Sequence, residues 1–151
     1  MKRIGYVSGA FDLFHIGHLN ILKNAKCRCD YLIAGVVSDE MLKINKGLTP
    51  VIPLAERLEI VRNIQFVDEA RIEAIPSKLD VWREIKFDVF FKGDDWASTD
   101  KGRALEQDLS GVGVEMVYLP YSATTSSSAL RRAIESVNRM AERSGYVQGD
   151  G

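Results

Sequence analysis

Short apolar runs alternate with longer helical stretches along most of the chain. Five runs are dense in Val, Ile, Phe or Tyr and short enough to be buried parallel strands, at residues 3–7, 31–37, 69–74, 87–91 and 114–119. The pattern between and after them predicts helices at 18–26, 54–63, 78–84, 101–109 and 127–143. This alternation predicts an α/β fold, a five-stranded parallel sheet with right-handed crossovers and helices on both faces.

The last predicted helix is amphipathic. Leu130, Ile134, Val137 and Met140 share one face, and the other face is charged. A helix of this kind usually packs its apolar face on a core, so we expect it to cover the sheet. It would complete one domain of residues 1–143, followed by a polar, Gly-rich flexible tail at 144–151.

Composition is that of an ordinary globular protein. The 151 residues are 46% hydrophobic and 27% charged, with a formal net charge of −1. A net charge near zero argues against broad binding of nucleic acid or of an anionic membrane surface. No apolar run approaches the roughly 18 residues that span a bilayer, and the first residues lack the apolar core of a secretory signal. We therefore expect a cytoplasmic protein.

Cys27 and Cys29 are the only cysteines. Two cysteines alone cannot complete a zinc site, and no pair of histidines lies near them in the sequence. We expect reduced thiols in the turn between a helix and the next strand.

Four polar clusters follow predicted strands, where open parallel sheets bind ligands. The first runs from Gly9 to His18. Gly9 allows a tight turn and close approach of a ligand, and Gly17 leaves room beside the imidazoles. His15 and His18 are the only histidines and lie three residues apart where a helix begins. Free N–H groups at a helix start favour phosphate, so this cluster predicts a phosphate site.

The remaining clusters each allow a structural alternative. Ser38 or Asp39 could cap a short helix, and Lys46 and Gly47, in a loop, could be solvated or could reach an anionic group. The run Lys-Gly-Asp-Asp-Trp at 92–96 suits contacts with a base or ribose, or forms a turn. The hydroxyl run at 124–128 leads into a helix and exceeds the need of one N-cap, which favours an anion cradle.

These motifs resemble those of a known family. The segment G-x-F-D-x-x-H-x-G-H at 9–18 resembles the signature of the nucleotidyltransferases that include the cytidylyltransferases. The segments at 66–69, 92–96 and 117–120 are most similar to those of glycerol-3-phosphate cytidylyltransferases, and the likeness covers about residues 3–136. The resemblance implies a Rossmann-like fold and transfer of CMP from CTP to a small phosphorylated alcohol, with release of pyrophosphate.

The resemblance also implies roles for residues. His15 and His18 would donate to phosphate oxygens, and Lys46 would bind the acceptor phosphate. Asp12 and Asp39 would orient loops. The expected nucleotide-binding residues are Gly9, Ala10, Phe11, Gly17, Lys92, Gly93, Asp94, Tyr121, Thr125, Ser126, Ser127 and Ser128. Mg²⁺ would enter with the triphosphate, held by phosphate oxygens and water. The family commonly forms homodimers, so we expect a homodimer.

Two arginines of the family pattern are replaced. The late motif R-T-x-G-I-S-T-T keeps its hydroxyl half, but Tyr121 stands in place of Arg. Gln65 stands where the family has another arginine, with Arg62 one helical turn earlier. Guanidinium groups suit phosphate, so the acceptor stays open, and so does an adenylyltransferase that uses ATP on a sugar or cofactor phosphate. A non-catalytic nucleotide-binding module is the remaining alternative; a pure scaffold would leave the paired histidines without a purpose.

Overall fold

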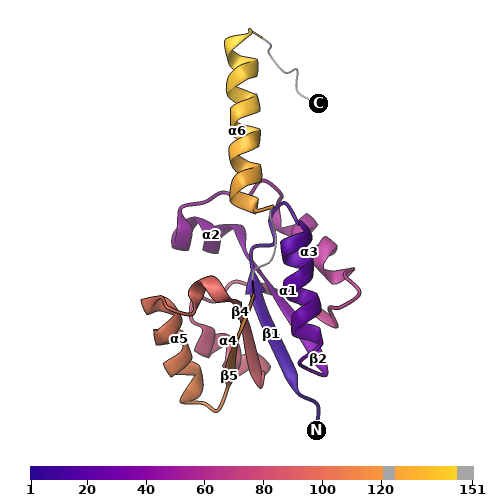
Figure 1. Ribbon diagram of the computed structural model, residues 1–151, viewed down its shortest axis with the longest axis vertical. Helices are drawn as coiled ribbons and strands as arrows, with labels where there is room; N and C mark the ends of the chain where they lie inside the picture. The colour runs from indigo at the N-terminus through magenta and orange to yellow at the C-terminus, as the bar shows by residue number, and fades with distance from the viewer. Residues whose placement is uncertain (121–124, 146–151) are drawn as a thin grey trace.

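Five parallel strands form the centre of the molecule (Figure 1). The computed structural model describes residues 1–120 and 125–145. The strands are β1 (Ile4–Gly9), β2 (Tyr31–Val37), β3 (Glu69–Glu73), β4 (Val89–Gly93) and β5 (Glu115–Leu119). They lie in the order β3-β2-β1-β4-β5, and each neighbouring pair is parallel. The predicted five-stranded parallel sheet is confirmed.

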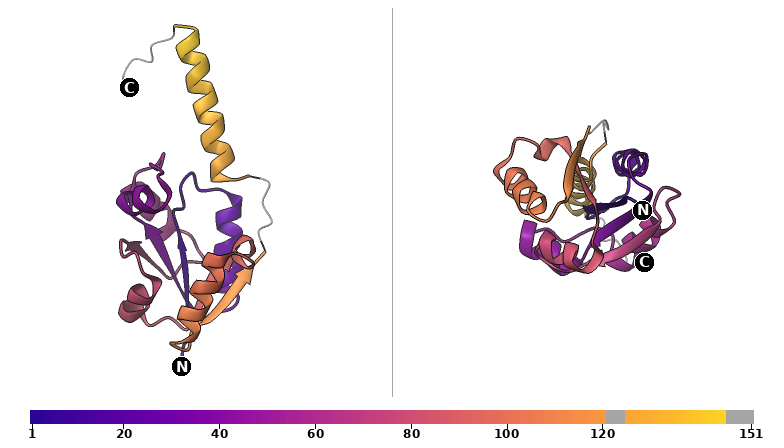
Figure 2. Two further views of the ribbon diagram at one scale, coloured as in Figure 1. Left: turned by 90° about the vertical axis from the view of Figure 1, so that its left-hand side faces the viewer. Right: turned by 90° about the horizontal axis from the view of Figure 1, so that it is seen from below.

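Helices cover both faces of this sheet, as predicted (Figure 2). The helical elements are α1 (Ile16–Lys26), α2 (Asp39–Lys46), α3 (Leu54–Arg62), α4 (Lys78–Ile85), the 3₁₀ turn η1 (Asp94–Trp96), α5 (Asp100–Ser110) and α6 (Ser127–Arg143). Side chains of α1 and α3 pack in one apolar layer with one face of the sheet, and those of α4 and α5 pack in a second layer with the other.

Alternation along the central strands explains the two layers. Tyr6 belongs to the layer under α4 and α5, whereas its neighbour Val7 belongs to the layer under α1 and α3. Phe90 and Phe91 on β4 divide in the same way, and neither is exposed. Successive strand residues point to opposite faces, so strands buried on both faces are apolar throughout, as the sequence shows.

The strand order creates a switch point between β1 and β4. From β1 the chain builds outward to β2 and β3, then returns to build β4 and β5 on the other side. Ligands bind at such a point, outside the carboxyl ends of the strands. β1 runs two residues beyond the predicted range because Ser8 and Gly9 pair with Gly35 and Val36 of β2. β4 likewise ends at Gly93 rather than Phe91.

The segment after β2 is more helical than predicted. Ser38 caps α2, its Oγ accepting from the N–H of Met41 at 3.2 Å. Lys46 is the last residue of this helix rather than part of a loop, and Gly47 ends it in the left-handed conformation with φ 62°. A left-handed glycine is a common helix C-terminus, so placing Lys46 in a loop was wrong.

The expectation that residues 127–143 cover the sheet is also wrong. Figures 1 and 2 show α6 projecting away from the other elements. None of its residues is buried, and Val137 and Met140 are 60% and 68% exposed. The helices α1 and α3 already pack on one face of the sheet and α4 and α5 on the other, so α6 does not take that place. Only its first turns contact the domain.

Two further expectations concern the ends and the cysteines. Cys27 ends α1 and Cys29 lies before β2, both as free thiols, which confirms their place in a helix-to-strand turn. In the described part of the chain, no helix has the length and apolar character needed to cross a membrane. Residues 146–151 of the predicted tail lie outside the described residues.

Candidate active site

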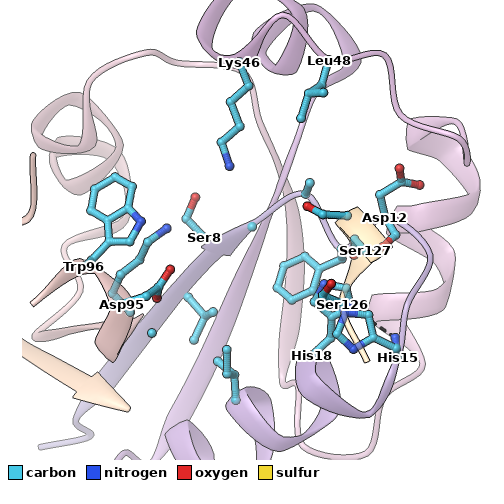
Figure 3. Close-up of a pocket in the computed structure, with 18 of the residues that line it drawn as sticks. Ser8, Asp12, His15, His18, Lys46, Leu48, Asp95, Trp96, Ser126 and Ser127 are labelled. Atoms are coloured by element: carbon cyan, nitrogen blue, oxygen red, sulfur yellow. Dashed lines mark hydrogen bonds between the residues drawn. The ribbon is translucent and has the colours of Figure 1, made fainter. Parts of the chain in front are cut away.

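A cavity of about 470 Å³ lies at the carboxyl ends of β1 and β4, at the switch point (Figure 3). It brings together side chains from the two ends of the sequence: Ser127 of α6 bonds to Asp12, which is 115 positions earlier. The predicted site residues that line this cavity are Gly9, Ala10, Phe11, Asp12, His15, His18, Lys46, Lys92, Gly93, Ser126, Ser127 and Ser128.

The two histidines form the start of α1. His15 is the N-cap, and its Nδ1 accepts from the N–H of Gly17 at 3.0 Å. Nδ1 of His18 accepts from the N–H of His15 at 3.2 Å. The ring centroids are 4.1 Å apart. The helix thus begins two residues before the predicted start at residue 18, because the histidines themselves replace the usual Ser/Thr and Glu/Gln of a capping box.

The surroundings of both imidazoles favour the neutral form. Burial, and then the proximity of His15, lowers the pKa of His18 to about 4, with Asp12 opposing the shift. Burial also lowers the pKa of His15. Because Nδ1 accepts in each ring, the single proton of the neutral ring must be on Nε2. The pair therefore offers two Nε2–H donors without two buried positive charges.

The loop between β1 and α1 is held in a demanding conformation. Phe11 and Leu13 have φ of 53° and 52°, in the left-handed region that side chains disfavour. Asp12 lies between them, 1% exposed, and its carboxylate accepts from the N–H groups of Val51 and Ile52 at 2.9 Å each. These bonds fix the loop against the segment between α2 and α3.

Ser126 and Ser127 of the hydroxyl run make different hydrogen bonds. Ser126 is the N-cap of α6, its Oγ accepting from Ala129 N–H at 3.1 Å. Ser127 donates its hydroxyl to the backbone oxygen of Asp12 at 2.7 Å, which fastens α6 to the β1–α1 loop. Figure 3 shows Ser126 and Ser127 beside the two histidines. The N-terminus of α6 and that of α1 therefore face one cavity, and both favour anions.

Arg131 was missed by the sequence reasoning. It lies one turn into α6, lines the cavity and has its Nε 3.6 Å from the Asp12 carboxylate. This Nε is buried and has no hydrogen-bond partner among the described residues. Its place one helical turn after the serines could have indicated it, because residues i and i+4 of a helix share a face.

The ends of β4 and η1 form the opposite wall. The ammonium of Lys92 lies 4.2 Å from the ring centroid of Trp96, a cation–π contact. Burial, and then the charges of Lys46 and Lys78, lowers the pKa of Lys92 to about 8. Gly93 leaves room for Asp95, whose carboxylate oxygen would be 2.6 Å from an added Cβ.

A buried arginine, Arg57, connects the segments that form the site. This role was not predicted from the sequence. Arg57 of α3 is not exposed at all and donates to the backbone oxygens of Ile52, Ala10 and Val37 at 2.7–2.8 Å. It also pairs with Asp39. One planar guanidinium thus joins the ends of β1 and β2 to the start of α3. An arginine within a helix that also contains other charged residues carries no sequence signal for such a role.

Some predicted residues do not line the cavity. Gly17 bonds to His15, and Asp39 pairs with Arg57. Asp94 is exposed, and its neighbour Asp95 lines the wall instead. Thr125 lies just before the lining serines, and Tyr121 falls outside the described residues. Within the described ranges, no group of three or more His, Cys, Asp or Glu side chains is placed to hold a metal ion.

Comparisons with known proteins identify the family of the chain. Residues 6–133 match the model of the cytidylyltransferase-like family. An FAD synthase of Pyrococcus abyssi is 38% identical over 118 residues, covering 76% of this chain and 78% of the relative. An ethanolamine-phosphate cytidylyltransferase of Arabidopsis thaliana is 41% identical over 97 residues, covering 60% of this chain but 22% of the relative.

A solved structure shares the fold. The lipopolysaccharide core biosynthesis protein of Thermoplasma volcanium superposes with a TM-score of 0.69 at 24% identity, covering 83% of this chain and 100% of that one. Such identity shows the fold alone. Together with the family match over most of the sequence, it confirms the Rossmann-like fold. The chain therefore belongs to the cytidylyltransferase-like family of nucleotidyltransferases.

Proposed function

We propose that the protein transfers CMP from CTP to a small phosphorylated alcohol, of which glycerol 3-phosphate is the first candidate, and releases pyrophosphate. The observation that carries the proposal is the convergence of two helix N-termini, the paired histidines and the lysines Lys46 and Lys92 on one cavity. Such a cavity suits a polyphosphate better than a neutral ligand.

The chemistry is an in-line displacement. An oxygen of the acceptor phosphate attacks the α-phosphorus of the nucleotide, one P–O bond forms, and the bond to the leaving pyrophosphate breaks. No covalent intermediate on the protein is needed. Charge grows on the α-phosphoryl oxygens and on pyrophosphate, so positioned donors lower the barrier.

The described residues can supply these donors. The Nε2–H groups of His15 and His18 would meet the phosphoryl oxygens, with the α6 N-terminus and Arg131 beside them. Lys46 reaches toward the middle of the cavity in Figure 3, where the acceptor phosphate would lie. Ser127, already bonded to Asp12, would serve as an anchor for α6 rather than as a donor.

Mg²⁺ fits this site only as a companion of the nucleotide. Asp12 is the carboxylate beside the histidines, and both of its oxygens are occupied by backbone N–H groups. Phosphate oxygens and water would therefore hold the ion. Bound there, it would neutralise part of the triphosphate charge.

Adenylyl transfer is the second candidate. The Pyrococcus abyssi relative is named FAD synthase and matches over a larger share of this chain than the Arabidopsis thaliana cytidylyltransferase does. The replacement of a family arginine by Tyr121 removes one argument for the cytidylyl branch. An ATP-dependent reaction on a sugar or cofactor phosphate would use the same histidines and helix ends.

A pyrophosphate-release screen tests these alternatives. CTP and ATP are each offered with glycerol 3-phosphate, phosphoethanolamine, sugar phosphates and FMN, and products are identified by mass spectrometry. We expect turnover with CTP and a small alcohol phosphate; turnover with ATP alone would replace the first candidate by the second. Nucleotide binding without pyrophosphate release from any pair would indicate a binding module. Sedimentation of the same sample tests the expected homodimer.

A further inference from the structure

A buried carboxylate lies next to the candidate active site without lining its cavity. Glu73, the last residue of β3, is 3% exposed and does not line the cavity that holds the histidines. Its carboxylate accepts from Tyr6 Oη at 2.5 Å, from Ser8 Oγ at 2.9 Å and from Lys78 Nζ at 2.7 Å. A carboxylate in a buried position needs such donors. The three bonds join the end of β3 to β1 and to the start of α4.

The bond from Tyr6 to Glu73 passes over the strand between them. Tyr6 lies on β1 and Glu73 on β3, with β2 in between. Gly35 of β2 leaves the space, because a Cβ built on it would lie 1.9 Å from Tyr6 Oη. Burial, and then the Glu73 carboxylate, raises the pKa of Tyr6, so the phenol stays protonated as a donor. A glycine, a tyrosine and a glutamate on three neighbouring strands therefore fit together to hold one negative charge at this place.

Three lysines share a cavity with this charge. The cavity has a volume of about 510 Å³, and it is lined by Glu73 and by Lys46, Lys78 and Lys92. Burial, and then the charges of Lys46 and Lys78, lowers the pKa of Lys92 to about 8. The carboxylates of Asp95 and Glu73 oppose this lowering of the Lys92 pKa. The ammonium groups are thus close enough to repel one another, and Glu73 reduces the repulsion.

The remaining charged groups of this cavity do not replace Glu73. Lys101 and Asp108 of α5 also line the cavity, but neither is among the groups that shift the pKa of Lys92. Asp95 has the larger opposing effect on Lys92, yet it is exposed. Solvent and salt screen an exposed charge far more than a buried one. Glu73 is therefore the opposing charge that solvent screens least.

We propose that Glu73 is a positioning residue for the transfer reaction: it fixes Ser8 and Lys78 and keeps a negative charge beside the lysines. The proposal rests on the proposed function, since it assigns the charge of Lys92 to the binding of phosphate. Glu73 makes no contact with substrate and acts through Ser8 and Lys92, which line the cavity of the histidines. Its charge keeps Lys92 an ammonium at neutral pH before any anion is bound.

The variant Glu73→Gln separates the charge of this side chain from its shape. A glutamine has nearly the same size, and its amide oxygen can still accept from Tyr6 and Ser8, but the negative charge is lost. The lysines then repel one another more strongly, so the pKa of Lys92 should fall further. We expect a roughly 3- to 10-fold increase in the acid dissociation constant of Lys92. A purely structural role of Glu73 predicts no such change in a folded variant.

NMR titration of protein labelled with ¹³C at the lysine Cε atoms, without nucleotide, measures this change. The resonance of Lys92 is identified by its absence from Lys92→Arg. We expect a midpoint at about pH 8 in the wild type and a lower one in Glu73→Gln, with Glu73→Asp recovering part of the difference. The matched control is Glu69→Gln, which removes the same charge from the same strand at a residue that lines neither cavity. Its midpoint should equal that of the wild type.

An unchanged Lys92 midpoint in folded Glu73→Gln, or an equal shift in Glu69→Gln, overturns the inference. Either result leaves the proposed function intact, because the titration needs no turnover. If Glu73→Gln does not fold, Lys78→Met decides: loss of a neighbouring positive charge should raise the Lys92 midpoint, and a fall or no change refutes the inference.

Kinetics of the same variants test the link to the reaction. With substrates that the wild type turns over, the alkaline limb of kcat/KM should move to lower pH in Glu73→Gln, by the same amount as the Lys92 midpoint. A limb that does not move refutes the positioning role. A wild type that turns over no pair of substrates overturns the proposed function instead, and the titration still decides whether Glu73 controls the charge of Lys92.

Discussion

Nδ1 of His18 accepts a hydrogen bond from the backbone N–H of His15, and Nδ1 of His15 accepts one from the N–H of Gly17. The two rings thus form a reciprocal cap on α1. The spacing of three residues is required by this cap, because the N-cap and N3 positions face each other. The same bonds turn both Nε2–H groups outward as donors. The motif combines a helix start with a phosphate site, and each property depends on the other.

Removal of the His18 ring should reduce turnover by roughly 10²–10³, the cost of one aimed donor in sites of this kind. His18→Gln is the sharper variant, because a glutamine at N3 keeps the capping acceptor. We expect His18→Ala to lose both turnover and about 1 kcal/mol of capping stability, and His18→Gln to lose mainly turnover. Assays of pyrophosphate release beside thermal melting check both; near-native turnover in either variant would refute the role.

His18 should also make folding stability depend on pH. Its pKa is lowered from 6.5 to about 4 in the folded state, so the unfolded chain binds more protons between these values. Stability is therefore lost as the pH falls through this window, by up to about 3 kcal/mol at about 1.4 kcal/mol per pKa unit. Urea unfolding of the wild type and of His18→Gln measures this. Parallel stability curves for the two proteins would contradict the prediction.

Lys92 should set the alkaline limit of activity. Its pKa of about 8 means that the free protein loses this charge above pH 8. Because kcat/KM reports the free enzyme, kcat/KM for the acceptor should fall above that pH. Lys92→Arg keeps its charge, so its profile should stay flat to higher pH, whatever its absolute rate. An identical alkaline limb in both proteins would assign the limit to another group.

Arg131 should contribute to nucleotide binding. Arg131 lines the cavity, and its buried Nε, 3.6 Å from the Asp12 carboxylate, has no hydrogen-bond partner among the described residues. We expect Arg131→Met to raise the KM for the nucleotide roughly 10-fold or more, as for a lost charged hydrogen bond. Arg132→Met is the control, because Arg132 is exposed and outside the cavity. Equal effects of the two substitutions would show only a loss of general positive charge.

Arg57 should be essential for stability rather than chemistry. Arg57→Met removes the buried guanidinium that donates to the backbone oxygens of Ala10, Val37 and Ile52. Breaking such a buried charged network costs about 3–5 kcal/mol. Arg62→Met, on the exposed side of the same helix, removes only a surface ion pair and should cost less than about 1 kcal/mol. Denaturant unfolding compares them, and similar losses would disprove the structural role of Arg57.

Local signals made part of the site predictable. A strand, a glycine, two histidines three residues apart and a hydroxyl run before a helix are all visible within short windows. The residues that these segments contact in the folded protein are not visible in such windows. Nothing in the sequence around Glu73, which ends β3 between Ile72 and Ala74, distinguishes it. It becomes buried because β3 pairs with β2, and Tyr6, Ser8 and Lys78 then donate to its carboxylate. The choice of Asp95 over Asp94 depends on one 3₁₀ turn.

The sequence by itself determined the order of strands and helices, the parallel sheet and the position of the histidine motif after β1, because hydrophobic period and capping are properties of neighbouring residues. Only the tertiary structure decided that α6 projects from the domain, that Arg57 is buried and that Arg131 faces the cavity. These outcomes depend on which surfaces are already covered and which chain ends meet. Distant segments compete to cover the same surfaces, and the hydrophobic periodicity of a single segment does not show which of them succeeds.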